Sequence, residues 1–385
     1  MFQLLSEFWR YIKYFTDAKK VWHWPRQSDV LIFDACGQDI LLEYVRSWNP
    51  EVLHVRNEFI NLPVLLTSIF RDGKKSDAYI DRFIEKVRPK LVVTFIDNNL
   101  GFYAISRRHP SVKTMFIQNG LRSRILEGKK PEDTHGKVDY MMVFGSDIGS
   151  EYSKYIRGNS VSIGSLKNNH YPKSQSKALG TIAFISQYSD FESAIVGGKL
   201  FTHNQFYQAD KIVLENLLKY ADKYGRRFLI IPAHGFENSI LIKEKEFYSD
   251  LLGQSVSYYD PREFGSSYYN TDEAEVVVGV SSTLLYESIA RGNKTAIFPL
   301  RGQLLDAKDH TYGWPGEYVD DGPFWTNHPN PENFERIMDH LFEINDAQWH
   351  AELAEYSFDK VMTYDSGNGI LKTILTKELG SRPTG

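Results

Sequence analysis

Residues 276–292 read VVVGVSSTLLYESIARG, an apolar run that passes directly into a segment with helical character. The run is continuous rather than alternating, which is typical of a strand buried on both faces of a parallel sheet. Serines and a threonine stand at the junction, where residues of this type commonly precede a helix. A buried strand followed at once by a helix is the repeating unit of a doubly wound α/β fold.

The same unit recurs along the 385 residues. In the first half we predict strands at 28–36, 51–55, 90–99, 113–120 and 138–145, with helices at 39–48, 77–89 and 101–108. In the second half we predict strands at 181–187, 227–234, 255–260, 275–280 and 294–299, with helices at 206–223, 239–252, 283–291, 331–344 and 346–362. The sequence therefore predicts two Rossmann-like domains with parallel sheets and a helical C-terminal tail.

The domain boundaries follow from changes in composition. Residues 1–165 form the first predicted domain, and 166–180 form a linker that is polar, contains Gly, Pro and Ser, and has no periodicity. The second domain is expected over 181–345, and 346–385 form a C-terminal helix and tail.

The composition excludes several classes of protein. A single cysteine, Cys36, excludes an internal disulfide and a multi-cysteine metal site. The net charge of −4 provides no overall basic field, so nucleic acid is not an expected partner. The sequence contains no apolar run long enough for a membrane span and no signal-peptide pattern, so we expect a cytoplasmic protein.

The N-terminal segment MFQLLSEFWRYIKYF (1–15) has apolar residues at helical spacing with basic residues nearby. Such a helix could lie on the inner face of the cell membrane as a peripheral contact. A first helix packed on its own domain would show the same stripe, and the sequence leaves both interpretations open.

Ligands of open parallel sheets bind beyond the carboxyl ends of the strands. Polar residues at the predicted strand ends are therefore candidate site residues. They are Asp34, Asp97, Asn98, Asn99, Gln118, Asn119, Arg122, Ser186, Gln187, His234, Ser281, Ser282 and Thr283. We expect one set from each domain to face the other across a cleft.

The junction at Ser281, Ser282 and Thr283 is the strongest candidate for donor binding. A helix that begins there has unpaired N–H groups and a positive dipole end, to which phosphate binds well. An ordinary N-cap is the alternative. Glu287 lies too far along to complete a capping box and is predicted to accept hydrogen bonds from a ribose diol.

His234 ends a strong predicted strand and could donate to a phosphate or protonate a leaving group. A histidine in a surface loop is the alternative. Ser186 and Gln187 could add donors to the same nucleotide ligand.

In the first domain Asp97 is the best candidate for a general base or nucleophile, since it directly follows a predicted strand. Asp34 occupies an equivalent position. Either aspartate could instead cap a helix. The predicted acceptor-binding residues are Asp34, Asn98, Gln118, Asn119 and Arg122.

The chain lacks several well-known cofactor and catalytic motifs. The sequence contains no GxGxxG after the first strand and no GxxxxGK[ST], which argues against nicotinamide cofactors and P-loop hydrolysis. HExxH, GxSxG and a DxD at a strand end are also absent. We therefore expect neither a cofactor nor a metal.

With these residues the chain resembles the GT-B class of glycosyltransferases, in particular bacterial enzymes of lipopolysaccharide and capsule biosynthesis. VGVSSTLLYESIARGNKTAIFP (278–299) looks like their donor-binding element, and IPAHG (231–235) resembles the histidine motif of bacterial sialyltransferases and Kdo transferases. FGSDIGSEYSKYIRGNSVSIGSLKNN (144–169) looks like the bridge between halves in these enzymes and in polyol-phosphate polymerases. Their usual His-Pro is here His234-Gly235.

The resemblance implies a metal-independent transfer of a sugar from a nucleotide donor to a glycan or lipid-linked glycan. A CMP-sugar such as CMP-Kdo fits the histidine, serine and glutamate set best. In this scheme Ser281–Thr283 and Glu287 hold phosphate and ribose, His234 stabilises the departing phosphate, and Asp97 acts on the acceptor hydroxyl or the anomeric carbon. Three alternatives remain: a non-hydrolysing nucleotide-sugar 2-epimerase, a polyol-phosphate transferase and a non-catalytic carbohydrate-binding protein.

Overall fold

A computed structural model describes residues 16–56, 58–71, 74–121, 136–196, 198–233, 238–260 and 265–381. The predicted N-terminal helix (1–15), Arg122 and His234 lie outside the described residues.

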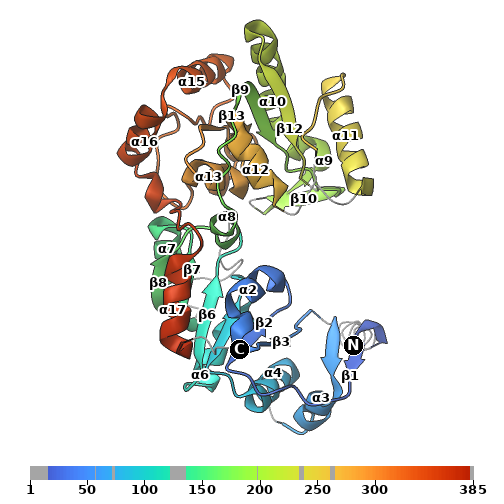
Figure 1. Cartoon of the computed structure of the whole chain (residues 1–385). Helices are drawn as coiled ribbons and strands as arrows, with labels where there is room; N and C mark the ends of the chain where they lie inside the picture. Colours follow the sequence, from blue (N-terminus) through green and yellow to red (C-terminus); the bar gives the residue numbers. More distant parts are fainter. Residues whose placement is uncertain are drawn as a thin grey trace.

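The first half is built on a six-stranded parallel sheet with the strand order β3-β2-β5-β6-β7-β8 (Figure 1). Its strands are β2 (Val30–Phe33), β3 (Glu51–Leu53), β5 (Leu91–Thr94), β6 (Lys113–Ile117), β7 (Gly136–Val143) and β8 (Ile156–Ser162). Every residue of β2 and β5 is buried, as expected for strands covered on both faces. The helices between them are α2 (Gln38–Val45), α4 (Lys75–Val87), α5 (Leu100–Tyr103), α6 (Ile105–Arg108) and α7 (Ser146–Ser153).

A small unit lies beside the edge strand β3. In it β1 (Lys19–Val21) pairs in parallel with β4 (Phe59–Asn61), which leads directly into α3 (Leu62–Ser68). The Asn61 side chain caps α3 by accepting from the Val64 N–H, and Pro63 occupies the first turn, where its missing N–H costs nothing.

The second half contains a parallel sheet with the order β12-β9-β13-β14. Its strands are β9 (Ala178–Ile185), β12 (Arg227–Ile231), β13 (Ala274–Gly279) and β14 (Thr295–Ile297). The principal helices are α10 (Gln208–Tyr224), α11 (Asn238–Leu252), α12 (Ser266–Glu273), α13 (Thr283–Ala290), α15 (Pro331–Glu343) and α16 (Asp346–Glu355). An antiparallel hairpin of β10 (Ser193–Val196) and β11 (Lys199–Thr202) leads into α9 (His203–Phe206), and α14 (Arg301–Leu304) follows β14.

The chain crosses between the halves twice, and the two crossings are bonded to each other. The first contains α8 (Leu166–His170), and the second leads into α17 (Gly369–Leu379), which returns to the first half. Asn169 Nδ2 donates to Asn368 Oδ1 at 3.0 Å, and the Asn169 carbonyl accepts from the Gly367 N–H at 2.7 Å. Figure 1 shows α17, in red, beside β7 and β8.

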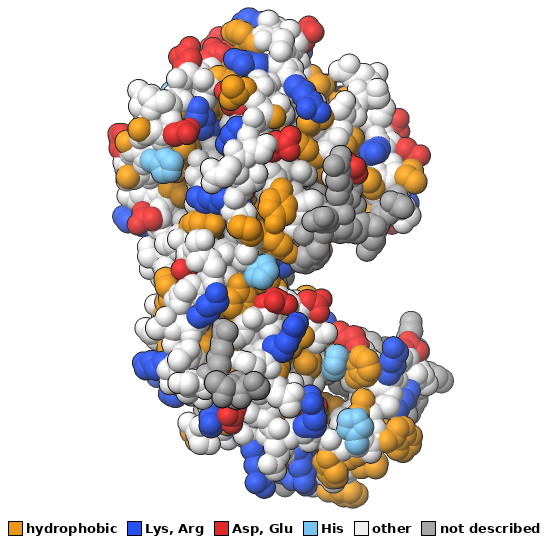
Figure 2. All heavy atoms as spheres, in the orientation of Figure 1, with side chains coloured by type: hydrophobic (Ala, Val, Ile, Leu, Met, Phe, Trp, Pro, Cys, Tyr) orange, Lys and Arg blue, Asp and Glu red, His pale blue; other side chains and the backbone are white. Residues whose placement is uncertain are grey.

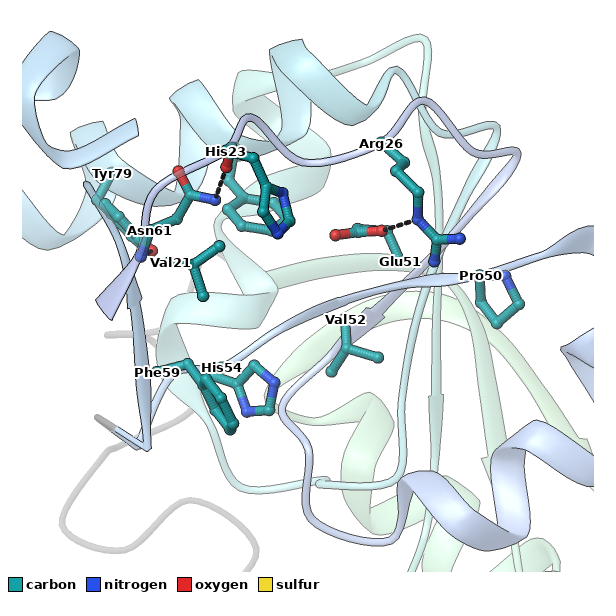
Figure 3. A pocket seen from close by; sticks show the side chains of 11 residues that line it. Val21, His23, Arg26, Pro50, Glu51, Val52, His54, Phe59, Asn61 and Tyr79 are labelled. Carbon is teal, nitrogen blue, oxygen red and sulfur yellow. Dashed lines mark hydrogen bonds and ion pairs between the residues drawn. The ribbon is translucent and has the colours of Figure 1, made fainter. Parts of the chain in front are cut away.

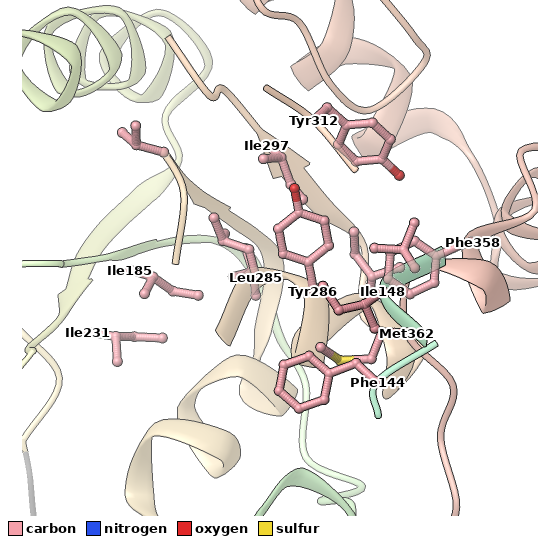
Figure 4. Close-up of a cluster of buried hydrophobic side chains, with 14 of the residues drawn as sticks. Phe144, Ile148, Ile185, Ile231, Leu285, Tyr286, Ile297, Tyr312, Phe358 and Met362 are labelled. Atoms are coloured by element: carbon pink, nitrogen blue, oxygen red, sulfur yellow. The ribbon is translucent and has the colours of Figure 1, made fainter. Parts of the chain in front are cut away.

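Apolar contacts also join the halves. Phe144 and Ile148 of the first half belong to the same buried cluster as Tyr286 of α13 (Figure 4). Phe358 and Met362 of the second crossing complete this contact, with the Phe358 and Tyr286 rings stacked at 6.5 Å between centroids. The apolar junction between the two halves is therefore packed as a core.

The prediction of two Rossmann-like domains with a helical C-terminal region is confirmed. Two local predictions differ from the structure. Residues 255–260 form only a single bridge, Tyr258 to Ile230, instead of a strand. Part of the predicted linker is the buried helix α8. Helix α17, within the predicted C-terminal helix and tail, packs on the first sheet. Strand β8 and helix α12 were not predicted.

Candidate functional site

The carboxyl edges of the two sheets meet at one place. The Leu121 N–H, just beyond β6, donates to Thr283 Oγ1 at the start of α13, at 3.0 Å. Gly120 lies against the same hydroxyl, which a Cβ on that glycine would approach to 3.8 Å. The predicted acceptor loop and the predicted donor loop are thus in direct contact. Figure 2 shows the hollow that opens between the two halves on one side of the molecule.

The three hydroxyls of the donor loop have different local partners. Ser282 is the N-cap of α13, and its Oγ accepts from the Leu284 N–H at 3.3 Å. Ser281 donates through both its N–H and its hydroxyl to Gln187 Oε1, at 3.1 and 3.2 Å. The N-cap alternative is therefore realised at Ser282, while Ser281 ties the loop to the end of β9.

A buried arginine that the sequence analysis did not select completes this edge of the sheet. Arg301 Nη1 donates to Ser281 Oγ at 2.7 Å and to Gln187 Oε1 at 2.8 Å. Its Nη2 forms an ion pair with Asp210 of α10, and both side chains are 1% exposed. Arg301 follows β14 beyond Pro299, so extending the strand-end search by two residues would have found it. It places a positive charge beside the donor loop.

Glu287 lies inside the structure and faces the first crossing between the halves. Its carboxylate accepts from the Ser165 hydroxyl and from the Tyr268 hydroxyl, the latter at 3.3 Å. Burial raises the pKa of Glu287, an effect that these hydrogen bonds and the charge of Lys167 partly offset. In this structure the carboxylate joins α13 to the start of α8, and its predicted contact with a ribose stays a prediction.

The raised pKa of Glu287 predicts a pH dependence of stability. The unfolded carboxyl group titrates near 4.5, so the folded protein holds this proton at a higher pH than the unfolded chain. The stabilisation that protonated Glu287 provides is fully present below about pH 4.5 and is lost as the pH rises through the pKa of Glu287 in the folded protein. Glu287→Gln should remove this loss, which amounts to about 1.4 kcal/mol per pH unit between the two pKa values.

Urea unfolding of both proteins at a series of pH values checks this expectation. The free energy of unfolding of Glu287→Gln should increase relative to that of the parent as the pH rises above about 4.5. Glu335→Gln serves as a control of opposite sign, because a hydrogen bond from Lys223 lowers the pKa of Glu335. A pH-independent difference between Glu287→Gln and the parent would contradict the assignment.

Asp97 does not line the cleft. Its side chain is 0% exposed, and its Oδ2 accepts from the Tyr152 hydroxyl of α7. Its carbonyl oxygen accepts from the Tyr103 hydroxyl. This geometry does not support Asp97 as a general base or nucleophile, because an acceptor hydroxyl cannot reach a carboxylate enclosed in the first domain. The next residue, Asn98, is exposed, and Asn99 caps α5 by accepting from the Gly101 N–H.

Asp34 is likewise held by protein groups at the end of β2. It has a left-handed backbone (φ 78°), which Asp tolerates better than most residues. Its Oδ1 accepts from the Cys36 N–H at 2.9 Å, and its Oδ2 accepts from Arg56 Nε at 2.8 Å. Arg56 is half exposed while Asp34 is 1% exposed, so this edge presents the guanidinium to the solvent and keeps the carboxylate buried beneath it.

Gln118 orders the loop that meets Thr283. Its Oε1 accepts from the Phe144 N–H at 2.9 Å, and its Nε2 donates to the Gly120 carbonyl at 3.1 Å. Asn119 is partly exposed beside it. Gln118 is therefore placed to position the loop, and the side chain of Asn98 is exposed.

Ser186 is buried inside the second domain. Its Oγ accepts from the Tyr188 N–H at 3.1 Å and contacts the Tyr248 hydroxyl at 3.2 Å. The structure therefore brings Gln187 and Ser281–Thr283 together with the loop at 118–121, and it places Ser186, Asp97 and Glu287 in the interior around them.

A separate cavity of about 290 Å³ lies between the β1–β4 unit and β3 (Figure 3). His54 and Phe59 form its floor with ring centroids 4.5 Å apart, and burial lowers the pKa of His54. Arg26 and Glu51 form an ion pair at its rim, at 3.1 Å. Among the residues that the structure describes, no cluster of three or more His, Cys, Asp or Glu side chains could hold a metal ion.

Two solved structures illustrate what this chain is similar to. A structure of the wall teichoic acid polymerase TagF has a TM-score of 0.50 and 12% identity, with 93% of this chain and 90% of that chain covered. The UDP-GlcNAc 2-epimerase of Neisseria meningitidis, bound to UDP-GlcNAc, has a TM-score of 0.46 and 14% identity, with 91% and 98% covered. The likeness to TagF shows a GT-B-like fold.

A search of curated proteins gives no match. In the described parts of the chain, no helix is long and apolar enough to cross a bilayer. The model of a family described as "putative O-antigen biosynthesis protein" matches residues 115–379. Because this match covers more than half of the 385 residues, the chain belongs to that family of O-antigen biosynthesis proteins.

Proposed function

We propose that the protein is a metal-independent glycosyltransferase of bacterial surface polysaccharide assembly. One observation carries the proposal: the carboxyl edges of two parallel sheets meet, and the start of α13 contacts the loop after β6 through Thr283 and Leu121. In open α/β sheets this edge is where ligands bind, and a meeting of two such edges suits a reaction between two substrates. Membership in an O-antigen family agrees with that role.

The donor phosphate is assigned to the start of α13. The start of this eight-residue helix has a positive dipole end and the hydroxyls of Ser282 and Thr283, although the Leu284 and Leu285 N–H groups already donate to the Ser282 hydroxyl and carbonyl. Arg301 holds Ser281 in place by a direct hydrogen bond, and Asp210 balances its charge. The predicted contact of His234 with the phosphate stays a prediction.

The acceptor is assigned to the facing edge of the first domain. The exposed Asn98 and the half-exposed Arg56, which the buried Asp34 holds, offer hydrogen-bonding groups there, and the partly exposed Asn119 lies in the loop beside Thr283. We propose a glycan or a lipid-linked glycan as the acceptor and a CMP-sugar such as CMP-Kdo as the donor, on the resemblance to Kdo transferases and sialyltransferases. Contact of the N-terminal helix with the membrane belongs to the same proposal.

Removing the Thr283 hydroxyl should weaken donor binding. A hydrogen bond to a charged group contributes about 1.5–3 kcal/mol, so Thr283→Val should raise the donor Kd by about 10- to 100-fold. Calorimetric titration with CMP, CDP, UDP and GDP measures this effect and identifies the base. Thr283→Ser is the matched control because it keeps the hydroxyl that also accepts from Leu121. An unchanged Kd in Thr283→Val would overturn the placement.

Product analysis separates the proposed transfer from its alternatives. Transfer requires both donor and acceptor and yields a lengthened glycan without the donor phosphate. Isomerisation of the donor sugar without acceptor would identify an epimerase, and a product that retains phosphate would identify a polyol-phosphate transferase. A protein that binds glycan but no nucleotide would be a carbohydrate-binding protein.

A further inference from the structure

Five large apolar side chains of the first domain are exposed around β1 and α3. They are Trp22, Trp24, Leu66, Ile69 and Phe70, with exposed fractions of 76%, 43%, 59%, 48% and 90%. We call this group the apolar tip. Figure 2 shows hydrophobic side chains gathered at the lower end of the molecule, where Figure 1 places α3. Soluble proteins rarely expose a contiguous apolar patch without a partner.

The apolar tip is held in place by the fold. Strand β1 ends at Val21 and pairs with β4, which continues into α3, so the segment 22–24 and the end of α3 belong to one unit. Asn61 Nδ2 donates to the His23 carbonyl at 2.9 Å and so fixes the backbone between the two tryptophans. The exposure therefore arises from ordered backbone.

Basic side chains surround the apolar tip. Lys86 Nζ lies 4.3 Å from the centre of the Trp24 ring, and Arg82 Nε donates to Thr67 Oγ1 near the end of α3. The same region also carries Lys19, Lys20, Arg71, Lys74 and Lys75. Glu85, the acidic residue closest to this group on α4, is already paired with both Arg71 and Arg82.

We propose that the apolar tip and its basic rim form a docking surface for an anionic lipid bilayer. Tryptophan and phenylalanine insert at the level of the headgroups, and lysines and arginines beside them attract anionic lipid. The excess of positive charge favours a bilayer over a second copy of this chain, since two such surfaces would repel each other.

Sedimentation with vesicles tests this proposal with the full-length chain. The parent should bind vesicles of phosphatidylcholine and phosphatidylglycerol, and binding to phosphatidylcholine alone should be much weaker. The double variant Trp22→Ser, Phe70→Ser should lose about 10-fold or more in partition coefficient, because each ring buries a large apolar surface. The matched control is Leu179→Ser, Leu200→Ser, which removes two side chains that are 82% and 69% exposed in the second half.

Removing positive charges is a second, independent test of the proposal. Lys19→Gln and Lys74→Gln should each lower binding to anionic vesicles about fivefold and leave the weak binding to neutral vesicles unchanged. Unaltered thermal melting of each variant shows that it is folded. Equal binding by Trp22→Ser, Phe70→Ser and by the parent would overturn the proposal. So would a parent dimer in gel filtration that this variant dissociates, because the surface would then join two copies of the chain. The proposal does not depend on glycosyl transfer.

Discussion

Asp210→Ala should lower the free energy of unfolding by about 3–5 kcal/mol. The variant leaves the Arg301 guanidinium buried without its carboxylate, in a position that is 1% exposed. Stacking of Arg301 over the Phe206 ring, at 4.2 Å, and its hydrogen bonds to Ser281 and Gln187 do not replace a full negative charge. Urea unfolding at neutral pH measures the loss.

Two comparisons show whether burial causes this effect. Asp306→Ala breaks an ion pair with Lys199 of similar length, 2.8 Å, but in an exposed position, so it should lower the free energy of unfolding far less than Asp210→Ala does. The double variant Asp210→Leu, Arg301→Met should recover much of the stability, because it removes both charges. If Asp210→Ala costs no more than Asp306→Ala, the pair is not buried in solution. A stable double variant that no longer binds nucleotide would separate the role of Arg301 in the site from its role in the fold.

Arg291→Met should lower the free energy of unfolding by a similar amount, about 3–5 kcal/mol, and should loosen the first crossing between the halves. The Arg291 guanidinium donates to the carbonyl oxygens of Asn168, Tyr171 and Pro172, all in the first crossing between the halves. It also pairs with Asp272 of α12, at 2.5 Å, with side-chain exposures of 0% and 3%. Methionine retains the length of the side chain and loses every one of these bonds.

Unfolding in urea and limited proteolysis together test whether Arg291 stabilises the first crossing between the halves. We expect cleavage of Arg291→Met near residues 165–175 under conditions in which the parent is resistant. Arg71→Met is the control, since Arg71 makes two bonds to Glu85 at 2.9 and 2.6 Å but lies at the surface. It should lose no more than about 1 kcal/mol and should resist protease like the parent. If Arg291→Met also lost no more than about 1 kcal/mol, the result would contradict a stabilising role for the buried bonds of Arg291.

Strands that are buried on both faces could be predicted from the sequence because their signal is local. β2 and β5 lie inside the predicted ranges, β13 is shifted from its predicted range by one residue, and the helices that follow these strands begin close to the expected positions. The segment 255–260 has similar residue types, but only Tyr258 bridges to β12. Helix α8 was missed because its five residues are polar in part, and it is stabilised by contacts with distant groups such as Arg291.

The candidate site was predictable in its position and not in its contacts. The rule for strand ends placed Ser281–Thr283 and Gln118 on facing edges, and the contact between Thr283 and Leu121 spans 162 residues of sequence. The same rule selected Asp97, whose enclosure depends on Tyr152, 55 residues away. Arg301 and Asp210 stand 91 residues apart, and no local pattern connects them. Which strand-end carboxylates face a ligand is decided by such tertiary partners.

Helix α17 has a consequence for the order in which the chain can fold. Its residues Leu371 and Leu375 pack in one cluster with Val30 and Ile32 of β2, so the last described helix covers a face of the first sheet. During synthesis that face stays open until α17 has left the ribosome, which happens after the whole second sheet has been made, because domains fold as their residues emerge. The domain around the first sheet is thus completed only after the second sheet has emerged, and until then its sheet exposes an apolar surface on which a chaperone could act.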